Sequence, residues 1–199
     1  MPAAAPRRKE SPSTHAALAP RNVVLAVAVS LDGYIARKNG AVDWLATDPQ
    51  FDWGSYVQPF DVLVAGRKTL DIPEGHKGGT GPWGKMDCYI FSRSKSPGKR
   101  GSVEYVNQLP SKLIRKIREQ PGKDIWLMGG GELAREFLKE DLVDRMDLGI
   151  MPVLLGEGIP LFPQGFPQRN FVLEKFQTYK NGMVRAVYSR APVKTRGKN

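Results

Sequence analysis

The stretch that most constrains the fold is Ile125-Trp-Leu-Met-Gly-Gly-Gly-Glu-Leu-Ala-Arg-Glu-Phe-Leu138, where an apolar run ends in three glycines and an amphipathic pattern follows. This order predicts a buried strand, a turn of bare backbone and the amino end of a helix. A ligand can approach such a turn closely, and the free N–H groups of the first helical turn favour an anion. Glycines can also serve only the steric demands of a tight turn, so both interpretations stay open at this point.

Composition and charge favour one globular domain with basic ends. The chain has 199 residues, of which 41% are hydrophobic and 25% charged, with a formal net charge of +10. Residues 1–21 carry four basic side chains and one acid, and residues 190–199 carry four basic side chains and no acid. We therefore expect disordered basic tails at 1–21 and 191–199 around one domain at 22–190. A nucleic-acid-binding protein more often gathers its basic residues on a folded face, so we do not expect nucleic acid as a partner.

The sequence favours a cytoplasmic protein without membrane contact. No apolar run approaches the roughly 20 residues that a membrane-spanning helix needs, and the first residues lack the apolar core of a secretory signal. Residues 1–20 also fit an organellar transit segment, and that alternative stays open. The single Cys88 excludes an internal disulfide framework. His15 and His76 are isolated, so no metal site is expected.

Strand-like and helix-like segments alternate between the tails. Apolar runs predict strands at 23–29, 61–65, 88–91, 103–106, 125–128 and 145–151, and helical spacing predicts helices at 49–57, 110–119 and 132–139. Asp48 would be the N-cap of the first helix, with Pro49 in its first turn. Residues 171–179 and 183–189 predict a hairpin that turns at Asn181-Gly182. The expected fold class is therefore α/β, with a mostly parallel central sheet and a C-terminal antiparallel β-hairpin.

Clusters rich in hydrogen-bond donors directly follow three of the predicted strands. They are Gly66-Arg-Lys-Thr69, Ser92-Arg-Ser94 and Gly129-Gly-Gly131. The carboxyl ends of strands line the ligand crevice of an open parallel sheet. Backbone N–H groups, hydroxyls and guanidinium groups all suit phosphate. The three clusters together predict a nucleotide crevice.

Five segments then occur in an informative order: Ala28–Ala36, Val42–Leu45, Gly66–Thr69, Trp126–Ala134 and Pro152–Phe162. Together they resemble the dihydrofolate-reductase-like superfamily, and more closely its branch with the C-terminal reductase domain of bacterial riboflavin biosynthesis. The resemblance spans about residues 22–190. It implies a three-layer α/β fold and an NADPH-dependent reductase that transfers hydride to a small heterocyclic, pterin- or pyrimidine-like substrate.

Two further expectations accompany the resemblance. Relatives in this branch are often homodimers, and residues 152–162 and the terminal hairpin are the candidate contacts. The rival hypothesis is a nucleotide-binding module that keeps the fold without catalysis and interacts through its basic tails.

The resemblance also assigns candidate cofactor residues. The cofactor phosphates would be held by Gly66, Arg67, Lys68 and Thr69. The adenosine ribose, with its 2′-phosphate, would lie by Ser92 and Arg93. The pyrophosphate and nicotinamide would pass along Gly129, Gly130, Gly131, Glu132 and Leu133, with a cis peptide between two of the glycines. The nicotinamide would be bordered by Ala28, Ile35 and Ala36.

The proton donor stays open among three carboxylates. Dihydrofolate reductases use a carboxylate on the first helix, and here Asp48 and Asp52 are near that position without matching it. Asp32 is the third candidate, because the riboflavin branch has an aspartate there near the substrate. Each has a structural alternative, as an N-cap, a solvated side chain or a turn residue. The departure from the folate pattern argues against folate as substrate. Trp44, Trp53 and Trp83 could wall a pocket for a planar ligand, and the loop Glu74–Lys85 could be a lid.

Overall fold

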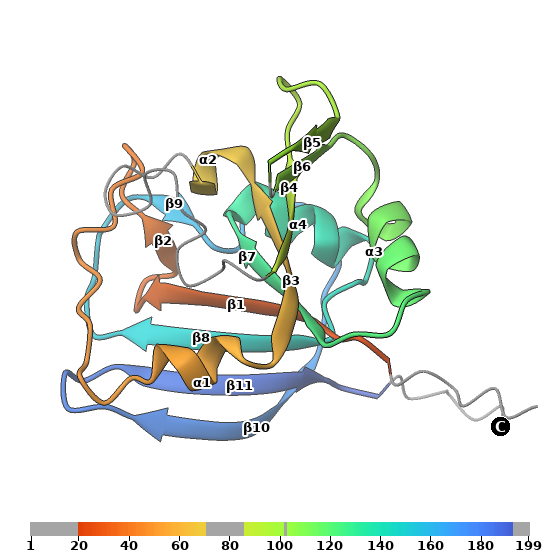
Figure 1. Ribbon diagram of the computed structural model, residues 1–199. Coiled ribbons are helices and arrows are strands. Elements are labelled where there is room, and N and C mark those ends of the chain that lie inside the picture. Colours follow the sequence, from red (N-terminus) through yellow and green to blue (C-terminus); the bar gives the residue numbers. More distant parts are fainter. Residues whose placement is uncertain (1–19, 71–85, 102, 193–199) are drawn as a thin grey trace, which may run out of the picture.

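A nine-stranded sheet runs through the centre of the molecule (Figure 1). The computed structural model describes residues 20–70, 86–101 and 103–192. In spatial order the strands are β10 (Phe171–Thr178), β11 (Val184–Arg190), β8 (Arg145–Met151), β1 (Val23–Ser30), β7 (Asp124–Gly129), β3 (Phe60–Gly66), β4 (Asp87–Phe91), β6 (Val103–Val106) and β5 (Gly98–Arg100). Residues 1–19 and 193–199 of the expected tails lie outside the described residues, as do the Glu74–Lys85 lid, His76 and Trp83, so those expectations stay predictions. The expected end of the first tail is wrong at Arg21, which is 6% exposed and donates to the carbonyl oxygen of Lys123 at 2.7 Å.

The strand directions confirm the expected α/β sheet. The six strands β8, β1, β7, β3, β4 and β6 run parallel to one another. β11 joins β8 antiparallel, and β10 completes the C-terminal hairpin on β11. At the other edge β5 pairs antiparallel with β6. The sequence did not reveal β5, because its three residues are all exposed and carry no apolar pattern.

Helices cover both faces of the sheet and give three layers (Figure 1). They are α1 (Trp53–Val57), α2 (Arg67–Leu70), α3 (Pro110–Arg118) and α4 (Gly131–Lys139). α3 and α4 contribute Leu113 and Phe137 to the main core, which also contains Leu127 of β7. α1 lies on the opposite face, where Tyr56 packs against a cluster that includes Trp126. Trp126 is thus a core residue, as predicted, and it is 3% exposed. No helix among the described residues has the length and apolar character needed to cross a membrane.

The predicted start of the first helix is wrong. The helix begins at Trp53, and its N-cap is Asp52, whose carboxylate accepts from two backbone N–H groups of the first turn. The side chain of Asp48 instead accepts from the backbone N–H of Gln50 at 2.8 Å and of Asn181 at 3.1 Å. Both aspartates can accept from a backbone donor two residues ahead, so local sequence did not distinguish them.

A second, two-stranded sheet forms from segments in which the sequence predicted no strand. β2 (Tyr34–Ala36) pairs antiparallel with β9 (Ile159–Pro160). Both strands are too short for an alternating pattern to show in the sequence. Their pairing brings the loop after β1 against residues 152–162.

Candidate functional site

The carboxyl ends of β3 and β7 converge at one edge of the sheet. Ala65 and Gly129 are register partners on these two strands. A Cβ on Gly66 would lie 3.8 Å from the carbonyl oxygen of Gly129 and 3.9 Å from the hydroxyl oxygen of Thr69. A Cβ on Gly130 would lie 3.7 Å from the same hydroxyl. The first and third donor clusters are therefore in contact.

The amino end of α4 opens toward this edge. The N-cap is Gly130, with extended backbone and no side chain to bond the first-turn N–H groups. The first helical bond to Gly130 comes from Ala134 N at 2.9 Å, so the N–H groups of Gly131, Glu132 and Leu133 precede the hydrogen-bonded ladder. A cis peptide joins Gly129 and Gly130, at the place that the resemblance implied. This helix start has the geometry that favours an anion.

The second cluster lies beside the first, because Gly66 and Phe91 are register partners on β3 and β4. Ser92 is buried, and its hydroxyl accepts from the backbone N–H of Lys95 at 2.9 Å, which closes the turn after β4. Arg93 is exposed and has no ion-pair partner in the part of the chain that the structure describes. Lys68 is also exposed. The exposed side chains of Lys68 and Arg93 thus place positive charge at the same sheet edge as the backbone of the glycine turn.

The three apolar residues assigned to the nicotinamide divide between two sides of the edge. Ile35 of β2 faces the glycine turn, since its Cδ1 would lie 3.6 Å from a Cβ on Gly130. Ala36 follows and is buried. Ala28 lies on the α1 side, opposite Gly149 of β8, and packs against a cluster around Met151.

All three candidate carboxylates are engaged by hydrogen-bond donors. Asp32 accepts from the Ser30 hydroxyl and from two backbone N–H groups of a distant loop. Asp48 is buried, and Asp52 is the exposed N-cap of α1. The hydroxyl and backbone N–H of Ser55, together with the N–H of Gly54, lower the pKa of Asp52 despite desolvation. Asp52 is therefore ionised at neutral pH.

An aromatic group lines the α1 side of the edge. Phe51 contacts Trp53 with ring centroids 4.8 Å apart and Tyr179 at 5.9 Å. Trp44 packs into the same region, against the cluster of Met151, Tyr179 and Met183. Its Nε1 is buried and has no hydrogen-bond partner among the described residues. Phe51 thus connects Trp53 to the cluster against which Trp44 packs, and the role of these tryptophans as the wall of a planar pocket stays a prediction.

A partly buried ion pair, which the sequence did not reveal, supports this aromatic group. Arg185 of β11 donates to both carboxylate oxygens of Asp147 on β8, at 2.8 and 2.6 Å. The guanidinium carbon of Arg185 lies 4.8 Å from the ring centroid of Tyr56 on α1. Burial raises the pKa of Tyr56, and the hydrogen bond to Asp147 raises the pKa of Arg185. Both groups therefore stay protonated, and the cluster ties α1 to the sheet.

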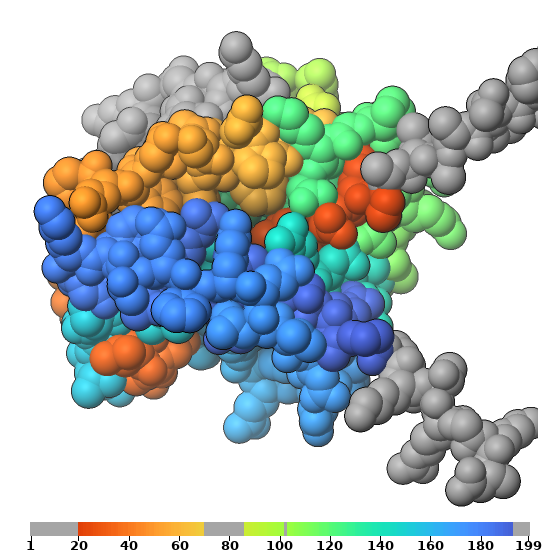
Figure 2. All heavy atoms as spheres, turned by 90° about the horizontal axis from the view of Figure 1, so that it is seen from below, coloured from red at the N-terminus to blue at the C-terminus, as the bar shows by residue number. Residues whose placement is uncertain are grey.

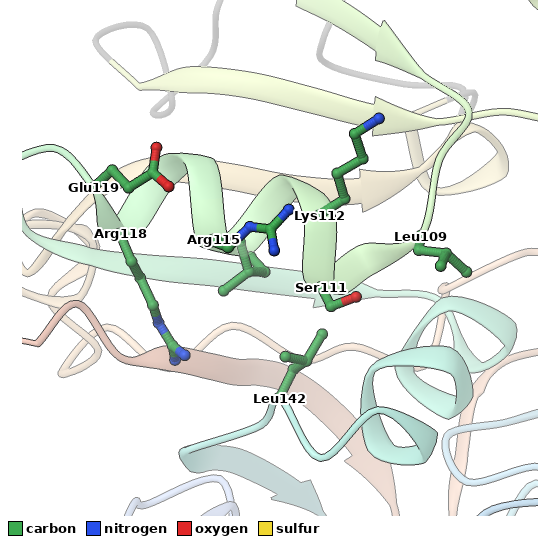
Figure 3. Close-up of a pocket in the computed structure, with 8 residues that line it drawn as sticks. Leu109, Ser111, Lys112, Arg115, Arg118, Glu119 and Leu142 are labelled. Carbon is green, nitrogen blue, oxygen red and sulfur yellow. The ribbon is translucent and has the colours of Figure 1, made fainter.

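An open hollow of the described surface lies elsewhere. Figure 3 shows it between α3 and Leu142, with a volume of about 660 Å³. Basic side chains of α3, among them Lys112, Arg115 and Arg118, form its rim. It contains none of the predicted site residues, so we place the site at the strand ends instead. Among the described residues, no group of three His, Cys, Asp or Glu side chains could hold a metal ion.

The fold and the donor-rich strand ends define an α/β domain of the reductase-like class. Residues 21–185 match the RibD C-terminal domain family, and the chain belongs to that family. The Bacillus subtilis (strain 168) protein YyaP is 35% identical over 178 residues, which cover 84% of this chain and 94% of YyaP.

Two solved structures show the likeness in three dimensions. A putative riboflavin biosynthesis protein from Shewanella sp. PV-4 has a TM-score of 0.71 and 28% identity, covering 86% of this chain and 99% of that one. The Thermotoga maritima diaminohydroxyphosphoribosylaminopyrimidine deaminase/5-amino-6-(5-phosphoribosylamino)uracil reductase has a TM-score of 0.65 and 16% identity, covering 86% and 57%. The second likeness shows the fold alone. The predicted family and fold are thus confirmed.

Proposed function

We propose that this protein is an NADPH-dependent reductase that transfers hydride to a small heterocyclic, pyrimidine- or pterin-like compound. One observation carries the proposal: two glycine-containing strand ends meet beside the uncapped amino end of α4 in a chain of the RibD C-terminal family. The Thermotoga maritima protein of the same fold is named as a reductase of a substituted uracil, which supports a pyrimidine-like substrate.

The chain's own residues would bind and orient the cofactor. The backbone of Gly129–Gly131 and the first turn of α4 suit the pyrophosphate. Thr69, Arg67 and Lys68 suit the phosphates, and the exposed Arg93 beside Ser92 suits a 2′-phosphate. The nicotinamide supplies the hydride, while the protein orients the two reactants and excludes water between them. Substrate would bind on the α1 side, against Trp44 and Phe51, whose rings suit a planar compound.

Removing the Arg93 guanidinium is expected to weaken NADPH binding by about 10- to 100-fold, the worth of one charge-assisted hydrogen bond. NADH lacks the 2′-phosphate, so its affinity should change much less. Fluorescence titration of Arg93→Ala with both cofactors measures the difference. Lys99→Ala is a matched control, because it removes an exposed positive charge from neighbouring β5. An equal loss for both cofactors would contradict the 2′-phosphate role of Arg93.

The same titration of the unaltered protein tests the proposed activity against its rival. NADPH binding followed by oxidation in the presence of a pterin or pyrimidine candidate is the expected result. NADPH binding without turnover on any candidate would favour the rival, a nucleotide-binding module with an interaction role. The absence of NADPH binding would rule out the reductase.

We also propose that two copies associate through the outer edge of β10. β10 pairs with β11 and, among the described strands, with no other. Its exposed side chains include Val172, Leu173 and Phe176, the last 68% exposed. In Figure 2 the hairpin of β10 and β11 spreads across the near face of the molecule. An exposed apolar edge strand favours pairing, and a two-fold contact closes the assembly instead of extending it.

Phe176→Asp is expected to convert a dimer into a monomer, because it places a charge in the apolar contact. Light scattering coupled to gel filtration measures the mass. Ser96→Asp introduces the same charge on an exposed loop near the opposite edge and should leave the dimer intact. A monomeric unaltered protein would contradict the proposed assembly.

A further inference from the structure

Asp32 links two loops that lie far apart in the sequence. Its Oδ1 accepts from the Ser30 hydroxyl at 2.6 Å. Its Oδ2 accepts from the backbone N–H of Leu155 at 3.0 Å and of Gly156 at 2.7 Å. Both carboxylate oxygens are therefore occupied, and the side chain holds the loop after β1 against the loop after β8.

The linked loop continues to the amino end of α4. Leu161 donates from its backbone N–H to the carbonyl of Gly33 at 2.9 Å, and its side chain is 1% exposed. Between these anchors a Cβ on Gly158 would overlap the carbonyl oxygen of Ala36. A Cβ on Gly131 would overlap the carbonyl oxygen of Pro160. Backbone thus packs on backbone from Asp32 to the first residue of α4.

We propose that Asp32 is a positioning residue that fixes the glycine turn of the cofactor site through residues 155–160, and is not the proton donor. The cofactor part of this inference rests on the proposed function. The linkage between Asp32 and residues 155–160 does not rest on the proposed function, because its contacts are present in the folded chain without any cofactor.

The charge state of Asp32 fits a positioning role. The Ser30 hydroxyl, followed by the N–H groups of Gly156 and Leu155, lowers the pKa of Asp32 and outweighs desolvation. A carboxylate with a lowered pKa stabilises the folded chain fully at pH values above its ordinary pKa. That stabilisation is lost as the pH falls through the lowered pKa. Asp32 is therefore ionised throughout the neutral range, where a general acid must carry a proton.

Asp32→Ala and Asp32→Asn test the proposal by cofactor affinity, the pH profile of kcat and amide hydrogen exchange. Asp32→Ala should weaken NADPH binding on the order of 10-fold, the loss expected for hydrogen bonds to a charged group. The NADPH affinity of Asp32→Asn should lie between those of the unaltered protein and of Asp32→Ala, because the amide oxygen of asparagine still accepts one hydrogen bond. Exchange should rise at residues 155–161 and 131–134 in both variants. Asp43→Asn is the control, since Asp43 is exposed and pairs with Arg37 outside this linkage.

One result would contradict the positioning role of Asp32. If Asp32→Asn abolishes turnover and leaves NADPH affinity and exchange at their original values, Asp32 acts as the acid and the proposal fails. If the unaltered protein binds no NADPH, the proposed function fails, and hydrogen exchange alone then decides the linkage. Unchanged exchange at 155–161 and 131–134 in Asp32→Ala would overturn it.

Discussion

Replacing Gly131 by alanine is expected to lower the free energy of unfolding by about 3 kcal/mol, because it forces an extra carbon into a packed position. The new Cβ would overlap the carbonyl oxygen of Pro160 and lie 3.2 Å from Cδ of Pro163. A backbone carbonyl cannot rotate away as a flexible side chain can. Residues 158–160 or the start of α4 must therefore move, and NADPH binding should fall with them. Urea unfolding and cofactor titration measure the two effects.

Gly130→Ala is the matched control for that prediction. The Cβ would meet only Cδ1 of Ile35 at 3.6 Å and Oγ1 of Thr69 at 3.7 Å, which are ordinary contacts. The stability of the fold should therefore change by less than about 1 kcal/mol. Cofactor affinity should still fall, since the added carbon faces the crevice. Equal stability of the two variants would show that Pro160 does not pack tightly on Gly131.

The sequence predicted the elements whose signals are local. The apolar run and three glycines before α4 indicated a strand, a turn and a helix start, and the structure places them at Asp124–Gly129 and Gly131–Lys139. Buried parallel strands are also easy to recognise, because both of their faces are apolar. The order of those strands made the convergence of Gly66 and Gly129 predictable, since parallel strands present their carboxyl ends at one edge.

Contacts between distant segments could not be predicted in the same way. The sequence marked Asp48 as an N-cap, but its second carboxylate oxygen accepts from the backbone N–H of Asn181 in the C-terminal hairpin. Residues 152–162 read from the sequence as an apolar loop and as part of the family resemblance, without a strand or helix pattern. Their physical role depends on Pro160 lying against Gly131, which no periodicity reveals. Tertiary contacts decided both cases.

The proposed substrate side of the site depends on another such contact, the pair of Arg185 and Asp147. None of the five residues of α1 is fully buried, and its core packing comes from Tyr56 and Val57, which pack against the cluster around Trp126. Tyr56 joins α1 to Arg185, and the fork of Arg185 bonds to Asp147, whose side chain is 9% exposed. Replacing Arg185 by leucine leaves that carboxylate buried without its partner. The expected loss of stability is about 3 kcal/mol, near the lower end for a buried pair, because Arg185 is 24% exposed.

The double variant Arg185→Leu/Asp147→Leu tests whether the stability lost in Arg185→Leu comes from the unpaired charge of Asp147. An apolar replacement of both partners should recover most of the lost stability, since no unpaired charge remains. Arg185→Lys should recover little, because an ammonium group cannot bond both oxygens in the fork geometry. Urea unfolding of the unaltered protein, of Arg185→Leu, of Asp147→Leu and of the double variant measures the coupling. If substrate binds beside α1, Arg185→Leu should lower kcat/KM for substrate while NADPH affinity stays unchanged. Equal losses of kcat/KM and of NADPH affinity would instead show that the pair supports the cofactor side of the site as well.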